Sequence, residues 1–449
     1  MTKQYRYLPD TEKDQQEMKD TIGISSIDAL FSDIPASVRQ KELSKLKPAL
    51  SELELTRHMK QMAAENVSAE EAVFFLGAGT YDHFIPSVVD HVISRSEFTT
   101  AYTPYQPEAS QGELQALFEF QTMICELTGM DVSNSSLYDG FASLGEACNL
   151  ATSVKKRSKV LYSAALHPQA TEVIQTYASG LEYQLKEIKQ ENGYTDLQVL
   201  KEEIDAETAA VIIQYPNFLG TVEDLSKVKT ICEEADAMLI VMANPLALGL
   251  LESPGKLGAD IVVGDMQPLG IPMSFGGPHC GYFTVLKKYM RKVPSRIVGE
   301  TVDANGKRGY VMTLQTREQH IRREKATSNM SSNQALMALS SAVCMSALGK
   351  QGIQEMAMQN FQKAHYLAKE LQKKGWSIYN DQTFFNEFVL ELNHPVEQIN
   401  RELLKQRIIG GLDVSNQTGK DGSMLICVTE KRTKEEIDQF VHALEGADK

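Results

Sequence analysis

Apolar and polar positions in the middle of the chain follow a pattern typical of strands separated by helices. Short apolar runs rich in β-branched residues predict strands at 160–163, 183–188, 209–215, 238–242, 261–263 and 282–286. Apolar residues at helical spacing predict helices at 169–178, 196–203 and 222–235. Strands that alternate with helices indicate an α/β fold, in which a large, mostly parallel sheet is covered on both faces.

The two ends of the chain differ from this middle part. Residues 1–66 are charged and predict short helices, which we expect to form an N-terminal helical arm that packs on a neighbouring subunit. Residues 67–345 are expected to form the large α/β domain. A helical, Ala- and Met-rich stretch leads from there into a smaller C-terminal α/β domain at 346–449.

Composition and charge narrow the class of partner. The 449 residues include 59 acidic and 45 basic ones, a formal charge of −14. This excess argues against nucleic acid or an anionic membrane as the main partner. The six cysteines are scattered without a Cys-x-x-Cys pair, so no metal site is predicted. With no signal peptide and no apolar run of membrane-spanning length, we expect a cytoplasmic protein.

A polar and aromatic loop at 99–112 is a candidate binding segment. Two prolines hold it extended, and it offers groups that stack and form hydrogen bonds: Tyr102, Tyr105, Gln106, Glu108, Ser110 and Gln111. A rigid connection between two helices explains the same residues equally well. Polar residues also follow two predicted strands, at 214–217 and 243–245, and ligands of open α/β sheets gather at such strand ends.

The segment Gly264–Gly281 lies between two predicted strands and contains Gly276-Gly277-Pro278. Many pyridoxal-phosphate enzymes present their cofactor lysine on a loop of this layout, since the cofactor forms a Schiff base with a primary amine. This segment contains no lysine, and the nearest are Lys256 and Lys287. A simple turn is the alternative. Upstream, a loop at 134–140 precedes a helix that we expect to open at Ser143 with a capping box to Glu146, a position that suits a phosphate.

Several stretches together resemble the P-protein of the glycine cleavage system. They are Arg6-Tyr7-Leu8-Pro9, residues 75–79, residues 102–112, residues 276–281 and Gln315–Asn329. The last is long and specific, and the resemblance follows the whole chain in order. The length is similar to that of subunit 1 of the two-subunit form of this family.

The resemblance implies a fold of pyridoxal-phosphate transferase type I and a decarboxylating glycine dehydrogenase. It implies that the complex decarboxylates glycine on pyridoxal phosphate and passes the aminomethyl group to the lipoyl arm of H-protein. The cofactor lysine belongs to subunit 2 in this family, which agrees with the lysine-free segment. The strand 238–242 also runs into Asn244, where such enzymes place an aspartate against the pyridine nitrogen. We therefore expect no cofactor anchored here.

What this chain contributes to the partner's active site is the remaining question. The loop at 102–111 is the first candidate, and Arg322, Thr327, Ser328 and Asn329 are the second, because their donors can approach a phosphate. Interface packing is the alternative for both. Two other functions stay open: a stand-alone pyridoxal-phosphate transferase and a non-catalytic scaffold subunit.

Overall fold

The computed structural model describes residues 7, 10–39, 48–99, 106–317, 319–326, 328–330, 333–379 and 383–448. The chain divides into two units, Met1–Val67 and Ser68–Lys449. The first unit contains α1 (Glu12–Ile22), a short 3-10 helix (Ile27–Phe31) and α2 (Glu52–Ala63). Thr11 and Ser51 begin α1 and α2 with capping boxes. Ser26 precedes the short 3-10 helix without a side-chain capping hydrogen bond.

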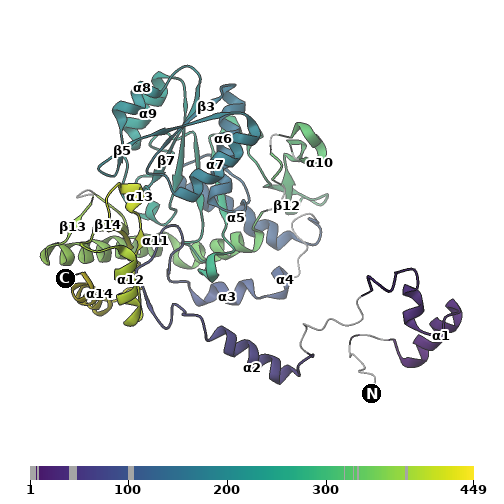
Figure 1. The fold of residues 1–449 in the computed structure, drawn as a ribbon. Coiled ribbons are helices and arrows are strands. Elements are labelled where there is room, and N and C mark those ends of the chain that lie inside the picture. Colours follow the sequence, from purple (N-terminus) through teal and green to yellow (C-terminus); the bar gives the residue numbers. More distant parts are fainter. Residues whose placement is uncertain are drawn as a thin grey trace. The chain divides into compact units, whose positions relative to one another are not determined.

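A seven-stranded mixed sheet organises the second unit (Figure 1). Its spatial order is β2 (Val132–Ser133), β10 (Gly281–Val285), β9 (Ile261–Asp265), β8 (Met238–Ala243), β7 (Thr208–Tyr215), β3 (Lys159–Ser163) and β4 (Gln184–Ile188). From β9 to β4 the strands are parallel, while β10 is antiparallel to β9 and to β2. All six predicted strands are present, so the predicted α/β fold is confirmed.

Helices cover both faces of this sheet because successive side chains of a strand point to opposite sides. In β7, Val211 and Ile213 join one buried cluster and Ala210 and Ile212 the other. The first cluster includes α5 (Gln111–Thr128) and α9 (Leu225–Glu234); the second includes α6 (Gly140–Lys155) and α7 (Pro168–Leu181). In Figure 1, α6 and α7 lie along the face of β3 and β7.

A second, four-stranded antiparallel sheet forms nearer the C-terminus. Its order is β13 (Ser377–Ile378), β14 (Glu387–Glu391), β17 (Ser423–Cys427) and β16 (Leu412–Asp413). It packs with α12 (Val396–Lys405) and α14 (Lys434–Asp448) around Phe388 and Phe440. The long helix α11 (Ala335–Lys373) leads into it and breaks at Gly349, where φ is +60°. The expected boundary at 345/346 falls shortly before this break.

The remaining α-helices and strands are short. They are α3 (Ser87–Ile93), α4 (Ser96–Thr99), α8 (Leu197–Glu203), α10 (Gln319–Arg322), α13 (Ser415–Thr418), the parallel pair β1 (Val73–Phe74) and β15 (Ile408–Ile409), the hairpins β5 (Gln190–Glu191) with β6 (Tyr194–Thr195), and β11 (Ile297–Val302) with β12 (Arg308–Thr313).

A tight turn at 217–220, which follows β7, lies against the start of β14 in the second sheet. Gly220 has φ of +89°, a left-handed conformation that favours glycine. A Cβ atom at Gly220 would lie 2.0 Å from the carbonyl oxygen of Glu387. The absence of a side chain therefore lets the 217–220 turn approach the start of β14, and this approach brings the second sheet to the carboxyl edge of the first.

Candidate functional site

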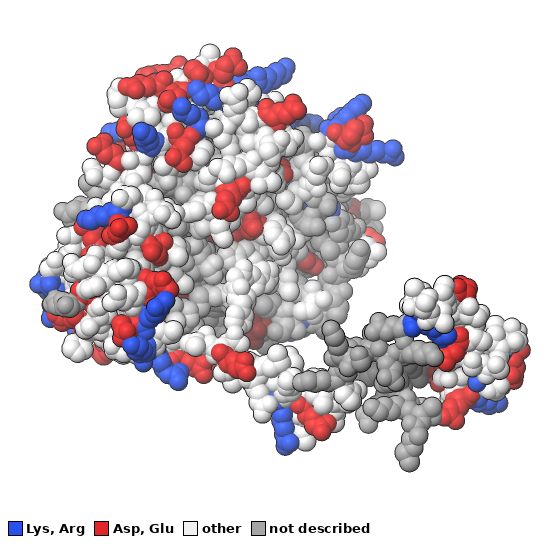
Figure 2. Space-filling model, in the orientation of Figure 1, with Lys and Arg blue, Asp and Glu red and all other residues white. Residues whose placement is uncertain are grey.

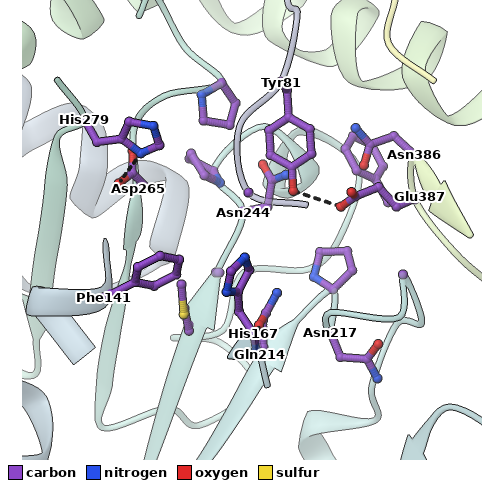
Figure 3. Close-up of a pocket in the computed structure, with 18 residues that line it drawn as sticks. Tyr81, Phe141, His167, Gln214, Asn217, Asn244, Asp265, His279, Asn386 and Glu387 are labelled. Carbon is purple, nitrogen blue, oxygen red and sulfur yellow. Dashed lines mark hydrogen bonds and ion pairs between the residues drawn. The ribbon is translucent and has the colours of Figure 1, made fainter. Parts of the chain in front are cut away.

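A cavity of about 70 Å³ lies at the carboxyl ends of β7 and β8 (Figure 3). Gln214 of β7 and Asn244, which follows β8, line it from the strand ends. Figure 3 shows Tyr81 and Glu387 across the cavity from Phe141 and His167. The cavity thus lies at the strand ends where ligands of open α/β sheets bind.

The two carboxamides have a fixed orientation. Gln214 Oε1 accepts a hydrogen bond of 2.8 Å from the backbone N–H of His167, and Asn244 Oδ1 accepts one of 3.0 Å from that of Leu246. Because a backbone N–H can only donate, these bonds identify the amide oxygens and leave the NH₂ groups on the other side. Within the described part of the chain, neither NH₂ group has a hydrogen-bond acceptor.

His167 forms an aromatic wall of the cavity. Its Nδ1 accepts a hydrogen bond from the backbone N–H of Gln169, so Nε2 carries the proton and donates to the carbonyl oxygen of Ala78 at 3.0 Å. The ring also packs against Phe141 at a centroid distance of 4.7 Å. Burial lowers the pKa of His167. The imidazole is therefore neutral, and both nitrogens are engaged within the protein.

Two carboxylates occupy the N-terminus of α6. Asp265 Oδ2 accepts a hydrogen bond of 3.0 Å from the backbone N–H of Gly140, and Asp139 Oδ1 accepts one of 2.6 Å from that of Ala142. The predicted capping box at Ser143 is wrong, because α6 begins at Gly140 with Asp139 as its cap. The backbone amides at this helix end are therefore bound to carboxylates of the chain itself.

His279 balances part of this negative charge. Its Nδ1 lies 3.1 Å from Asp265 Oδ2, and this hydrogen bond raises the pKa of His279. Burial raises the pKa of Asp139, and the nearby negative charge of Asp265 raises it further. At α6 the cavity is therefore lined by the carboxylate of Asp265 and by His279, which is paired with it.

Glu387, the first residue of β14, closes the opposite side. Its Oε1 accepts a hydrogen bond of 2.6 Å from the backbone N–H of Ala78, and its Oε2 accepts one of 2.8 Å from the hydroxyl of Tyr81. Burial raises the pKa of this carboxyl. The cavity therefore has a second acidic wall, contributed by a different sheet.

The described residues at this cavity do not fit pyridoxal phosphate. None of the lining residues is a lysine that could form the Schiff base. At the end of β8, where an aspartate would pair with the pyridine nitrogen of the cofactor, the chain has Asn244, a neutral amide. The amides of α6 that would receive a phosphate already bind Asp139 and Asp265.

The structure places the described part of the first predicted loop elsewhere. Glu108 and Gln111 line a wider groove of about 700 Å³ against β12. Gln111 holds this hairpin in place, because its Nε2 donates to the carbonyl oxygen of Tyr310 and its Oε1 accepts from the same residue's N–H, both at 2.8 Å. Gln106 is exposed and Ser110 is buried. Tyr102 and Tyr105 lie outside the described residues.

The second predicted group lies on and after α10. Arg322 is exposed and donates from Nε to the carbonyl oxygen of Thr316 at 3.0 Å. Ser328 Oγ accepts from the backbone N–H of Met330 at 3.0 Å, Asn329 is exposed, and Thr327 lies outside the described residues. Figure 2 shows basic side chains gathered over the part of this unit where α10 lies. Among the residues that the structure describes, neither of these two predicted groups lines the central cavity, whereas the predicted strand ends at 214–217 and 243–245 do.

Sequence patterns did not reveal several residues of the cavity, among them His167, Phe141 and Glu387. His167 had a detectable signal, since it follows the predicted strand at 160–163 and precedes Pro168, the first residue of a helix. Phe141 and Glu387 had none, because they reach the cavity only through tertiary folding.

Other kinds of site find no support in the described residues. They contain no group of three or more His, Cys, Asp or Glu side chains arranged to hold a metal ion. All six cysteines are free, and burial raises the pKa of Cys280. No helix in the ranges that the structure describes is long and apolar enough to cross a membrane.

Comparisons with known proteins agree on one family. The family described as glycine cleavage system P-protein matches residues 5–444. The probable glycine dehydrogenase (decarboxylating) subunit 1 of Geobacillus kaustophilus (strain HTA426) is 58% identical over 441 residues, 98% of each chain. The probable subunit 1 of Bacillus mycoides (strain KBAB4) is 56% identical over 98% of this chain and 99% of its own.

Solved structures support the same relationship. A crystal structure of glycine decarboxylase (P-protein) of the glycine cleavage system, in inhibitor-bound form, superposes with a TM-score of 0.91. It is 40% identical and covers 99% of this chain and 100% of its own. Glutamate decarboxylase of Lactobacillus brevis shares the fold, with a TM-score of 0.68 at 14% identity over 91% of this chain and 94% of its own.

Proposed function

The chain belongs to the glycine cleavage system P-protein family, as subunit 1 of glycine dehydrogenase (decarboxylating), and we propose that it works without anchoring pyridoxal phosphate. Its partner, subunit 2, carries the cofactor. The assembled enzyme decarboxylates glycine, releases carbon dioxide and passes the aminomethyl group to the lipoyl arm of H-protein.

The observation that carries this proposal is the pair of carboxylates at α6. Asp139 and Asp265 accept the backbone hydrogen bonds that a cofactor phosphate would need. A phosphate dianion there would displace them and face their negative charge. The lysine-free segment Gly264–Gly281 supports the same conclusion from the sequence.

The chain's contribution to catalysis would then be made at the partner's active site. We keep both predicted groups as candidates: Tyr102, Tyr105, Gln106, Glu108, Ser110 and Gln111 in the first, and Arg322, Thr327, Ser328 and Asn329 in the second. The groove that contains Glu108 is also lined by Lys307 and Arg308. These cations and Arg322 suit an anionic group, because Arg and Lys bind phosphates and carboxylates.

The organisation into domains is part of the same proposal. Residues 1–66 would be an arm that packs on a neighbouring subunit. The described apolar side chains Phe31, Leu53 and Met59 are 45%, 60% and 55% exposed, which supports this role. The large and small domains would cover 67–345 and 346–449.

Borohydride reduction tests the central point. Incubation of the purified chain with pyridoxal phosphate, followed by reduction, is expected to leave no stoichiometric label on any single lysine. Subunit 2, treated in parallel, is expected to take one label. Stoichiometric labelling of one lysine in this chain, with glycine decarboxylation by the chain alone, would contradict the proposal and favour the stand-alone transferase.

A further inference from the structure

The cavity between the two sheets still has the features of a binding site. Its NH₂ donors come from Gln214 and Asn244, and its acidic wall is Glu387. We propose that this cavity binds a small zwitterionic amino acid of the size of glycine. The inference rests on the proposed function in one respect: the cavity must be free of pyridoxal phosphate.

The donor side fits a carboxylate. Gln214 pairs in register with Met242, and Asn244 lies two residues beyond Met242, so both carboxamides project from the same face of the sheet. Their oxygens are held by backbone N–H groups, which leaves the NH₂ groups of these two lining residues without a described acceptor in the protein. Two N–H donors can serve the two oxygens of a ligand carboxylate.

The acceptor side fits an ammonium group. Each oxygen of Glu387 accepts one hydrogen bond from the protein and keeps a further lone pair. Asn386 beside it is 2% exposed, and its Nδ2 donates to Asn360 Oδ1 at 3.4 Å. Asn386 lines the cavity, and its Oδ1 has no donor among the described residues. These oxygens can accept the N–H bonds of an ammonium group.

Size and charge narrow the class of ligand. A volume of about 70 Å³ holds only a few heavy atoms. No lysine or arginine is among the lining residues, and His279 is paired with Asp265. An anionic ligand would find no free cation, and a purely cationic one would leave the two carboxamide donors unmatched. A zwitterion satisfies both sides at once.

Calorimetric titration of the full-length, pyridoxal-phosphate-free chain tests this inference. Glycine is expected to bind saturably at millimolar concentration or below, whereas acetate, ethylamine and leucine each bind at least about tenfold more weakly. Acetate and ethylamine each lack one charge, and leucine exceeds the cavity. Equal binding of acetate, or no saturable binding of glycine by the folded chain, would overturn the inference.

Isosteric variants localise the binding. Asn244→Asp and Gln214→Glu keep the oxygens that accept the backbone N–H bonds but replace the donors with carboxylate oxygens. Each is expected to weaken glycine binding at least about tenfold. Asn416→Asp, which makes the same charge change on the exposed surface of α13, is the matched control and should bind glycine like the unaltered chain. Circular dichroism verifies folding, and unchanged affinity in both cavity variants would contradict the assignment.

The test separates this inference from the proposed function. If the chain takes a covalent pyridoxal-phosphate label, the proposed function fails, whatever glycine does. If it takes no label and glycine does not bind, only the present inference fails.

Discussion

Asp265 Oδ2 accepts the backbone N–H of Gly140 at a distance of 3.0 Å, which connects the carboxyl end of β9 to the N-terminus of α6. The same carboxylate accepts the backbone N–H of Gln267 at 2.9 Å and pairs with His279 at 3.1 Å. The carboxylate of Asp265 thus occupies the position at a helix N-terminus where an anionic ligand would bind.

Replacing this carboxylate should cost stability and change a neighbouring pKa. Asp265→Asn removes one of the two carboxylates from the α6 N-terminus and weakens two backbone hydrogen bonds, so we expect a loss of about 1–3 kcal/mol in the free energy of unfolding. The pKa of His279 should fall, since Asp265 is what raises it. Urea titration measures the first effect and NMR titration of His279 the second. An unchanged His279 pKa would show that the pair does not form.

The buried carboxyl of Glu387 predicts a pH dependence of stability. Burial raises its pKa above 4.5, so the folded chain binds more protons than the unfolded chain between 4.5 and that raised value. Its contribution to stability therefore decreases as pH rises through this window. Glu387→Gln should lose this part of the pH dependence of stability. Compared with the unaltered chain, the variant should therefore be more stable at neutral pH than it is in acid.

Urea unfolding at a series of pH values from about 4.5 upward measures this difference. The exposed Glu126→Gln variant is the control and should follow the unaltered chain. Other buried carboxyls, such as Glu223, contribute to the absolute slope, so the comparison between variants isolates Glu387. Parallel curves for the Glu387 variant and the unaltered chain would contradict the prediction.

Gly220 provides a test of how the two sheets meet. Gly220→Ala introduces a Cβ atom 2.0 Å from the carbonyl oxygen of Glu387, at a φ of +89°. We expect a loss of about 2 kcal/mol or more in the free energy of unfolding. Gly180→Ala is the matched control: Gly180 lies inside α7, its added Cβ meets nothing within 4 Å, and we expect a gain of about 0.5–1 kcal/mol.

The sequence predicted the inner strands of the central sheet well because β7, β8, β9 and β10 are short apolar runs that are almost entirely buried. It did not predict the two-residue edge strand β2. It also identified the strand ends that carry Gln214 and Asn244. It did not reveal that Glu387 reaches the same cavity, because that residue follows Asn244 by more than a hundred positions and arrives on another sheet. Nor did it show Asp265 as an anion at α6, since local patterns do not report which carboxylate a helix end meets.

The predicted capping box at Ser143 failed for a related reason. The sequence contains a Ser-x-x-Glu pattern there, but Asp139 begins the helix one turn earlier. Ser143 is instead inside α6, where its Oγ donates to the carbonyl oxygen of Asp139 at 2.7 Å. Two signals competed for the same helix start, and the tertiary contact of Gly140 with Asp265 favours the earlier one.

Variants at Glu108 and Gln111 distinguish a catalytic role of the loop at 102–111 from a structural one in the assembled enzyme. Gln111 bonds to the backbone of Tyr310, so Gln111→Ala should lower the free energy of unfolding by about 1–3 kcal/mol. Glu108 is exposed in the groove, and Glu108→Gln should leave stability unchanged. If Glu108 reaches the partner's site, that variant should reduce the exchange of glycine with carbon dioxide at least about tenfold. Full exchange activity with Glu108→Gln would assign the loop to packing and favour the scaffold alternative.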